Sequence, residues 1–86
     1  MMKEFTYTIT HPNGLHGRPA ADLVTQARKL DSAVTIRKGE KSAGADRLMA
    51  LMTLGVAQGD AVTVTVEGGD EDQALERMKG YFEENL

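Results

Sequence analysis

The sequence predicts an α+β fold in which helices cover one face of an antiparallel sheet. Residues 3–10 and 62–67 alternate apolar and polar side chains, which is the pattern of strands with one buried face. Residues 20–30 and the segment after Asp70 instead repeat apolar side chains with helical spacing. Strands with one solvated face favour an antiparallel sheet whose other face packs against helices. The predicted order of elements is β-α-β-β-α-β-α.

The first strand, residues 3–10, ends at a loop. Its apolar side chains, Phe5, Tyr7 and Ile9, alternate with threonines, so we expect them to share the buried face. Residues 12–14, Pro-Asn-Gly, are turn formers, because proline presets φ while asparagine and glycine tolerate positive φ. A loop therefore separates this strand from the helix that follows.

The first helix carries one apolar stripe, made of the residues at positions 20, 23, 24, 27 and 30. Pro19 lacks a backbone N–H and is tolerated only in the first turn of a helix. We therefore expect His16 at or next to the N-cap, followed by a first turn made of residues 17–19.

Two short strands and a short helix are expected in the middle of the chain. Residues 33–37 alternate again, and the turn after them leads to a short, polar strand over residues 41–45. Such a strand suits a sheet edge, because charge and shortness discourage further pairing. Asp46 is expected to cap a helix that runs to about Leu54, with Gly55 as a left-handed stop.

The last strand and the last helix are separated by two glycines. Residues 62–67 place three valines on one face, and Gly68-Gly69 ends the strand. Asp70, followed three residues later by Gln73, resembles a capping box. The apolar residues at positions 74, 75, 78, 82 and 86 then form the buried stripe of the final helix.

Composition excludes several classes of protein. With 86 residues we expect one domain over residues 1–86, and the absence of cysteine excludes disulfides and thiolate metal sites. His11 and His16 give poor metal spacing, and a net charge of −3 with scattered basic residues does not suggest nucleic-acid binding. No apolar run would span a membrane, and the N-terminus lacks the apolar core of a signal peptide. We expect a cytoplasmic protein, and a monomer.

Residues 16–18, His-Gly-Arg, bring reactive chemistry to the start of the first helix. The first N–H groups of a helix lack intrahelical partners and carry partial positive charge, so they attract anions. Gly17 lets an anion approach the backbone, and the guanidinium of Arg18 can bind phosphate oxygens. A neutral imidazole has the lone pair that attack on phosphorus requires. From these residues, two interpretations of His16 stay open: a histidine that carries a phosphoryl group, and an ordinary surface or capping residue.

The segment Gly14-Leu15-His16-x-Arg18-Pro19-Ala20 resembles the active-site signature of HPr, the histidine-containing phosphocarrier family of the bacterial phosphoenolpyruvate-dependent sugar phosphotransferase system. Met49-x-x-Met52-Thr53-Leu54-Gly55-Val56, Gly59 and Gly68-x-Asp70-Glu71 resemble the second half of the family, so the similarity covers nearly the whole chain. The resemblance implies an open-faced β-sandwich with four strands and three helices. It also implies that His16 accepts phosphate on Nδ1 from Enzyme I and passes it to sugar-specific IIA domains.

On this resemblance, the amides of Gly17 and Arg18 would hold the phosphate, and the Arg18 side chain would neutralise charge in the transition state. Asn13 could also hydrogen-bond the site, although turn formation explains this residue equally well. No cofactor is expected. One histidine and one arginine without a substrate-sized pocket signature indicate a shuttle, not an independent enzyme.

The short helix is apolar around most of its circumference. A two-turn surface helix does not need all these side chains in the core, and methionines suit a surface that must fit several partners. The five large apolar side chains of this helix, at positions 48, 49, 51, 52 and 54, could all pack into the core. The resemblance instead assigns one face of the helix to Enzyme I and the IIA domains. We assign Leu48, Met49 and Met52 to that partner face and Leu51 and Leu54 to the core, and we expect the patch to continue through Gly17, Arg18 and Arg28.

Arg47 is a departure from the pattern of many Gram-positive members. Those proteins carry a regulatory serine, the target of HPr kinase/phosphorylase, at the position that Arg47 occupies here. An arginine cannot take the phosphate, so we expect no regulatory phosphoserine in this chain.

Two alternatives to the sugar carrier remain open from the sequence. The chain could be an HPr-like relay for another system, such as dihydroxyacetone kinase, or a regulatory paralogue. It could also be a small α+β interaction module that transfers no phosphate. Intact mass after incubation with phosphoenolpyruvate and Enzyme I would separate a carrier from a binding module.

Overall fold

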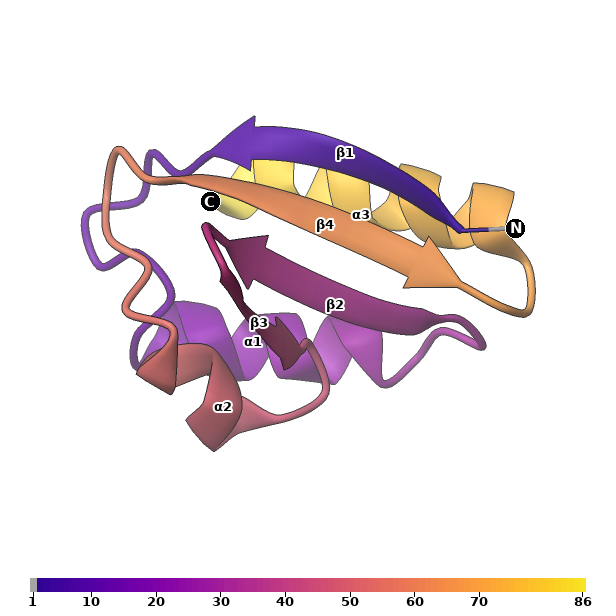
Figure 1. Cartoon of the computed structure of the whole chain (residues 1–86), viewed down its shortest axis with the longest axis horizontal. Coiled ribbons are helices and arrows are strands. Elements are labelled where there is room, and N and C mark those ends of the chain that lie inside the picture. The colour runs from indigo at the N-terminus through magenta and orange to yellow at the C-terminus, as the bar shows by residue number, and fades with distance from the viewer. Residues whose placement is uncertain (1) are drawn as a thin grey trace.

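Four antiparallel strands form one sheet with three helices packed against it in a computed structural model, which describes residues 2–86 (Figure 1). This arrangement confirms the predicted α+β open-faced sandwich and the predicted order of its elements. The elements are β1 (Lys3–Thr8), α1 (Arg18–Ala27), β2 (Ala33–Lys38), β3 (Lys41–Gly44), α2 (Leu48–Thr53), β4 (Ala61–Glu67) and α3 (Glu71–Asn85).

The strand order across the sheet is β1-β4-β2-β3, and every neighbouring pair is antiparallel. β4 lies between β1 and β2, with Val64 opposite Phe5 on β1 and Ile36 on β2. β3 lies at one edge, as its short, polar sequence predicts. The sheet thus joins the ends of the chain to its middle.

The core lies between the sheet and the helices. Val62, Val64 and Val66 of β4 are almost fully buried, which confirms the alternation read from the sequence. Phe82 on α3 is fully buried, and its ring makes edge contacts with the rings of Phe5 and Tyr7 at centroid distances of 5.6 Å. These contacts attach β1, at one edge of the sheet, to α3.

Three predicted elements are too long: β3 by one residue, since it ends at Gly44, and β1 and α1 by more. β1 ends at Thr8, because the next two residues bond outside the sheet. The Ile9 N–H donates to the Asp60 C=O in the loop before β4, and the Thr10 N–H donates to the Leu86 C=O at the end of α3. α1 ends at Ala27, not Leu30. The following residues form a tighter turn with i→i+3 hydrogen bonds before β2 begins.

The start of α2 differs from the prediction, whereas its end agrees with it. Asp46 does not cap α2, since the N-cap residue is Arg47 in extended backbone and no side chain of the described residues bonds there. Gly55 is the left-handed stop that the sequence predicts, with φ of 70°.

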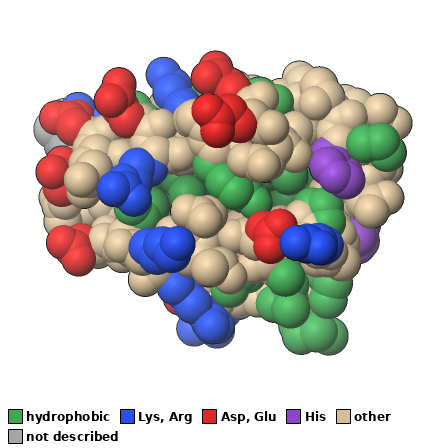
Figure 2. All heavy atoms as spheres, turned by 180° about the vertical axis from the view of Figure 1, so that it is seen from behind, with side chains coloured by type: hydrophobic (Ala, Val, Ile, Leu, Met, Phe, Trp, Pro, Cys, Tyr) green, Lys and Arg blue, Asp and Glu red, His purple; other side chains and the backbone are tan. Residues whose placement is uncertain are grey.

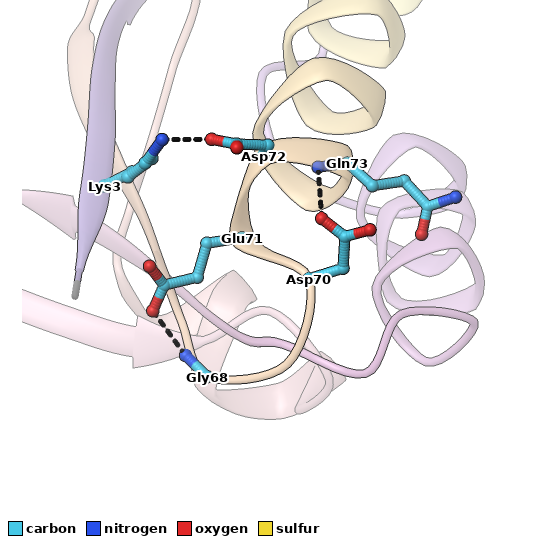
Figure 3. Close-up of polar contacts among 6 residues, drawn as sticks. All are labelled: Lys3, Gly68, Asp70, Glu71, Asp72 and Gln73. Atoms are coloured by element: carbon cyan, nitrogen blue, oxygen red, sulfur yellow. Dashed lines mark hydrogen bonds and ion pairs between the residues drawn. The ribbon is translucent and has the colours of Figure 1, made fainter.

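The start of α3 confirms half of the predicted capping box. The Asp70 carboxylate accepts a hydrogen bond from the Gln73 N–H at 3.1 Å (Figure 3). The Glu71 carboxylate accepts from the Gly68 N–H at 2.7 Å, so a neighbouring carboxylate also ties the glycine turn to the helix. On the far side of this turn the Lys3 ammonium pairs with the Asp72 carboxylate.

Candidate functional site

His16 is exposed and lies one residue before the N-cap of α1, as the sequence predicts. The N-cap is Gly17, which is therefore not part of the first turn as we expected. Its φ of 60° and ψ of −130° lie outside the helical region and suit glycine. Arg18 and Pro19 are the first two helical residues.

The amide end of α1 is open next to His16. The first hydrogen bond of the helix runs from the Ala21 N–H to the Gly17 C=O at 3.1 Å. The N–H groups of Arg18 and Ala20 precede this bond and have no partner within the helix, while Pro19 contributes none. This end of α1 therefore offers backbone donors and the positive end of the helix dipole to an anion held by His16.

The loop that carries His16 is anchored directly before the histidine. Leu15 is fully buried, and its N–H donates to the Val56 C=O at 3.1 Å. Gly14, with φ of 59°, lies so close to this strip of backbone that a Cβ would stand 2.2 Å from the Val56 oxygen. Sequence reasoning identified Gly14 only as a turn former and missed its close contact with residues 56 and 57.

Arg18 has a side chain that is 90% exposed, and its Nε lies 3.8 Å from an Asp22 carboxylate oxygen. Such an exposed i,i+4 pair is weak, so little energy is needed to turn the guanidinium toward another anion. Arg18 and Asn13 line a common hollow of about 300 Å³ between the histidine loop and the end of α3.

Asn13 acts through its backbone in this loop. Its N–H donates to Nδ1 of His11 at 3.0 Å. His11 is half-buried, and its ring folds back over the turn to accept this bond. The contact stiffens the turn of residues 11–14 ahead of His16.

The side chains of α2 divide as predicted. Leu51 is fully buried and Leu54 is 6% exposed, whereas Leu48 is 36% and Met49 is 72% exposed. Met52 is half-buried at the border between the two groups. Figure 2 shows hydrophobic side chains protruding at the lower right, at the end of the molecule where the histidines lie. An apolar surface therefore lies at the same end as the candidate site.

Arg28 and Arg47 are exposed at the two ends of the link between α1 and α2. The Arg28 guanidinium donates to the Asp46 C=O at 3.0 Å, which ties the end of α1 to the residue before the N-cap of α2. Arg47, at the N-cap, directly precedes the exposed Leu48. Both cations therefore lie beside the apolar surface of α2.

The loop after α2 is held by a charged pair. Asp60 accepts a hydrogen bond from the Ala57 N–H at 2.9 Å, and its carboxylate lies 2.9 Å from the Lys38 ammonium. The Ala57 N–H first, and then the Lys38 ammonium, hold the pKa of Asp60 below its ordinary value. This loop contains Val56, the residue that binds the backbone before His16.

Residues 2–86 contain no group of three or more histidine, cysteine, aspartate or glutamate side chains placed to hold a metal ion. Over the same residues, no helix has the length and apolarity that crossing a membrane would require.

Comparisons with known proteins agree with this geometry. Residues 3–84 match the family model described as the PTS HPr component phosphorylation site. The chain is 42% identical over 77 residues to a phosphocarrier protein HPr of Lysinibacillus sphaericus, covering 90% of this chain and 88% of that protein. It is 46% identical over 70 residues to an HPr of Haemophilus influenzae, covering 81% and 82%.

A crystal structure of HPr from Thermoanaerobacter tengcongensis superposes with a TM-score of 0.91 at 38% identity, covering 96% of this chain and 93% of that one. The match of the family model spans both the histidine loop and α2, so it does not depend on the short motif alone. The chain therefore belongs to the HPr phosphocarrier family of the phosphotransferase system.

Proposed function

We propose that His16 accepts a phosphoryl group on Nδ1 from phosphorylated Enzyme I and passes it to IIA domains of sugar permeases. The observation that carries this proposal is the position of His16, an exposed imidazole one residue before the open amide end of α1. In a chain of the HPr family, this is the place where a bound phosphoryl group would meet backbone donors.

The transfer exchanges one bond to phosphorus for another. The Nδ1 lone pair attacks phosphorus, the new N–P bond forms, and the bond between phosphorus and the donor breaks with its electron pair leaving on the donor. In the second transfer the N–P electron pair returns to Nδ1 as the IIA acceptor bonds to phosphorus. His16 is thus regenerated, and the chain acts as a carrier, not as an independent enzyme.

Arg18 and the backbone supply charge compensation during both transfers. Phosphoryl transfer depends on positioning and on electrostatic stabilisation of the equatorial oxygens. The Arg18 guanidinium would approach those oxygens from its exposed position, and the amides of Gly17 and Arg18 would hold the phosphate. A helix N-terminus stabilises an anion by only about 0.3–2 kcal/mol. That modest hold suits a group that must leave again.

The partner surface proposed for Enzyme I and the IIA domains consists of the exposed apolar face of α2 and the cations around it. Met49 and Leu48 are among the most exposed large hydrophobic side chains of the described residues. Exposed apolar side chains rimmed by charge are typical of protein interaction sites. The surface comprises Gly17, Arg18, Arg28, Leu48, Met49 and Met52.

Intact mass spectrometry after incubation with phosphoenolpyruvate and Enzyme I tests the proposal. We expect the mass to rise by one phosphoryl group in the wild type and to stay unchanged in His16→Ala. His11→Ala is the matched control, because it removes the second of the two histidines and should still be labelled. Labelling of His16→Ala would exclude His16 as the acceptor.

The choice of acceptor is tested in a second step. Labelled protein is mixed with IIA domains of sugar permeases and, separately, with the phosphoryl acceptor of a dihydroxyacetone kinase system. Faster loss of label to a sugar IIA domain supports the sugar carrier, whereas transfer only to the kinase system would replace it with the other relay.

A further inference from the structure

The histidine loop rests on a second loop, residues 55–60, which we call the support loop. Four hydrogen bonds join it to the segment of residues 9–15. The Gly59 N–H donates to the Ile9 C=O at 2.8 Å, the Ile9 N–H to the Asp60 C=O at 2.9 Å, the Gln58 side-chain amide to the Thr10 C=O at 3.0 Å and the Leu15 N–H to the Val56 C=O at 3.1 Å. The last of these bonds lies one residue before His16.

The support loop is closed by the Lys38 ammonium at the end of β2. Nζ of Lys38 donates to the Gly55 C=O at 2.8 Å and lies 2.9 Å from Oδ2 of Asp60. The same Asp60 oxygen accepts the Ala57 N–H at 2.9 Å. One cation therefore binds both ends of the loop, and one carboxylate binds its middle.

Two glycines make the support loop dependent on the contacts that restrain it. Gly55 and Gly59 both have positive φ, at 70° and 92°, and glycine loses much conformational freedom when it is ordered. The Lys38 and Asp60 side chains are only 36% and 33% exposed, which makes their pairing less screened than that of a fully exposed pair. Val56, between them, is fully buried and anchors the loop in the core.

We propose that Lys38 and Asp60 are positioning residues for His16, acting through the support loop on the backbone of Gly14 and Leu15. Neither side chain touches the phosphoryl group. Their pairing sets where the Val56 carbonyl stands, and that carbonyl sets where the chain enters the open end of α1. The inference rests on the proposed role of His16, because only a reaction at that imidazole makes its placement matter.

Single-turnover phosphorylation of His16 by phosphorylated Enzyme I tests this role. We expect Lys38→Met and Asp60→Asn each to slow the transfer by about tenfold, less than the roughly 100-fold that a 1 Å misplacement can cost. The double variant should be slowed by less than the product of the two single effects, because the two residues share one ion pair and act through one loop. Lys38→Arg keeps the cation and its donors, and should recover most of the rate.

A local readout distinguishes positioning from general destabilisation. Amide hydrogen exchange at Leu15 should accelerate in Lys38→Met and Asp60→Asn, while exchange in the β4 core stays slow. If Asp60→Asn fails to fold, Lys38→Met decides alone, since it leaves the Asp60 bond to Ala57 in place. A wild-type transfer rate with unchanged Leu15 exchange in a folded Lys38→Met variant would overturn the inference.

The Lys3 and Asp72 pair is the matched control. It is also a lysine-carboxylate pair, but it joins β1 to the start of α3 and belongs to neither loop (Figure 3). Lys3→Met and Asp72→Asn should transfer at the wild-type rate, and slowing equal to that of Lys38→Met would also overturn the inference. Labelling of His16→Ala would instead count against the proposed function, so the two failures are distinguishable.

Discussion

At the residue scale, Gly14 fixes how closely the histidine loop lies against the support loop. Its φ is positive, and a Cβ would stand 2.2 Å from the Val56 oxygen. Gly14→Ala should therefore slow phosphorylation of His16 and lower the free energy of unfolding by more than the about 1–3 kcal/mol that an unusual φ costs. Urea unfolding and single-turnover labelling measure both effects.

Gly39→Ala is the control for Gly14→Ala. Gly39 has the same φ of 59°, but a Cβ there would meet no atom within 4 Å. Gly39→Ala should lower the free energy of unfolding only by the cost of the positive φ, and it should leave the rate of His16 phosphorylation unchanged. Equal losses in the two variants would show that the contact with Val56 is unimportant.

Arg47 supports a second residue-scale prediction. Arg47 is exposed at the N-cap of α2, and the resemblance to many Gram-positive HPr proteins would place their regulatory serine at this position. Its side chain has no hydroxyl to accept phosphate. Incubation with ATP and an HPr kinase/phosphorylase should leave the wild type unlabelled, while Arg47→Ser should gain label at the new serine. Mass spectrometry of digested protein locates any label, and a phosphoserine or phosphothreonine in the wild type would contradict the prediction.

At the candidate site, the position of His16 could be predicted from the sequence, but the roles of Gly17 and Gly14 could not. The position of His16 followed from Pro19, whose missing N–H confines it to the first turn. The role of Gly17 as the N-cap did not follow, because either a helical or a left-handed φ is open to glycine. The contact between Gly14 and Val56 joins residues far apart in sequence, and no local pattern encodes it.

At the element scale, α2 combines a buried side with an apolar exposed side. Met49, 72% exposed, is central to the proposed partner surface, so Met49→Glu should weaken binding to Enzyme I by at least about tenfold, the scale of an interface hot spot. Met2→Glu is the control, since Met2 is 54% exposed and directly precedes β1, which begins at the end of the sheet opposite to α2 (Figure 1). Binding measured by titration calorimetry should be unchanged in that control. Equal affinity of wild type and Met49→Glu would remove α2 from the interface.

The support loop should respond to acid through Asp60. The pKa of Asp60 is lowered, first by the Ala57 N–H and then by Lys38, so the folded loop favours the charged carboxylate. The stabilisation is complete above the ordinary aspartate pKa of about 3.9 and is lost as pH falls through the lower folded value. The amide signal of Ala57 in NMR should titrate with a midpoint below that ordinary value, and Asp60→Asn should abolish the transition. If the Ala57 signal titrates with a midpoint at or above the ordinary aspartate pKa, charged Asp60 does not stabilise the support loop.

Element types were easier to predict than element ends. The 2-residue and 3.6-residue periods identified β1, β2, β4, α1 and α3, whereas β3 was expected after a turn and α2 between two expected caps. The periodic pattern continued past Thr8 and past Ala27, because Ile9 is buried in the core and Leu30 packs half-buried against it outside any strand or helix. Asp46 was misassigned as a cap because N-cap preference is statistical, and here the chain turns one residue later.

At the scale of the whole molecule, the order of the strands in the sheet could not be predicted from local sequence patterns. Alternation shows which face of a strand is buried, but nothing in it says that β4 lies between β1 and β2. In the sheet, β4 pairs with β1 on one side and with β2 on the other, and its three valines are buried there. The result places the loop before α1 and the loop before β4 at one end of the sheet, where they bond to each other.

The core that holds these two loops together should depend strongly on Phe82. This ring is fully buried and makes edge contacts with Phe5, Tyr7 and Tyr81. Phe82→Ala should lower the free energy of unfolding by about 3–5 kcal/mol, a large part of the about 5–15 kcal/mol typical of a domain. Urea unfolding followed by circular dichroism measures the loss.

Leu75→Ala is the matched control on the same helix. Leu75 is only half-buried and packs at the border of the core, so its removal should cost clearly less. At a temperature where both variants are folded, each should accept phosphate at the wild-type rate, because the Phe82 ring is buried in the core against Phe5, Tyr7 and Tyr81. Equal destabilisation by the two substitutions would mean that the aromatic cluster does not hold β1 against α3.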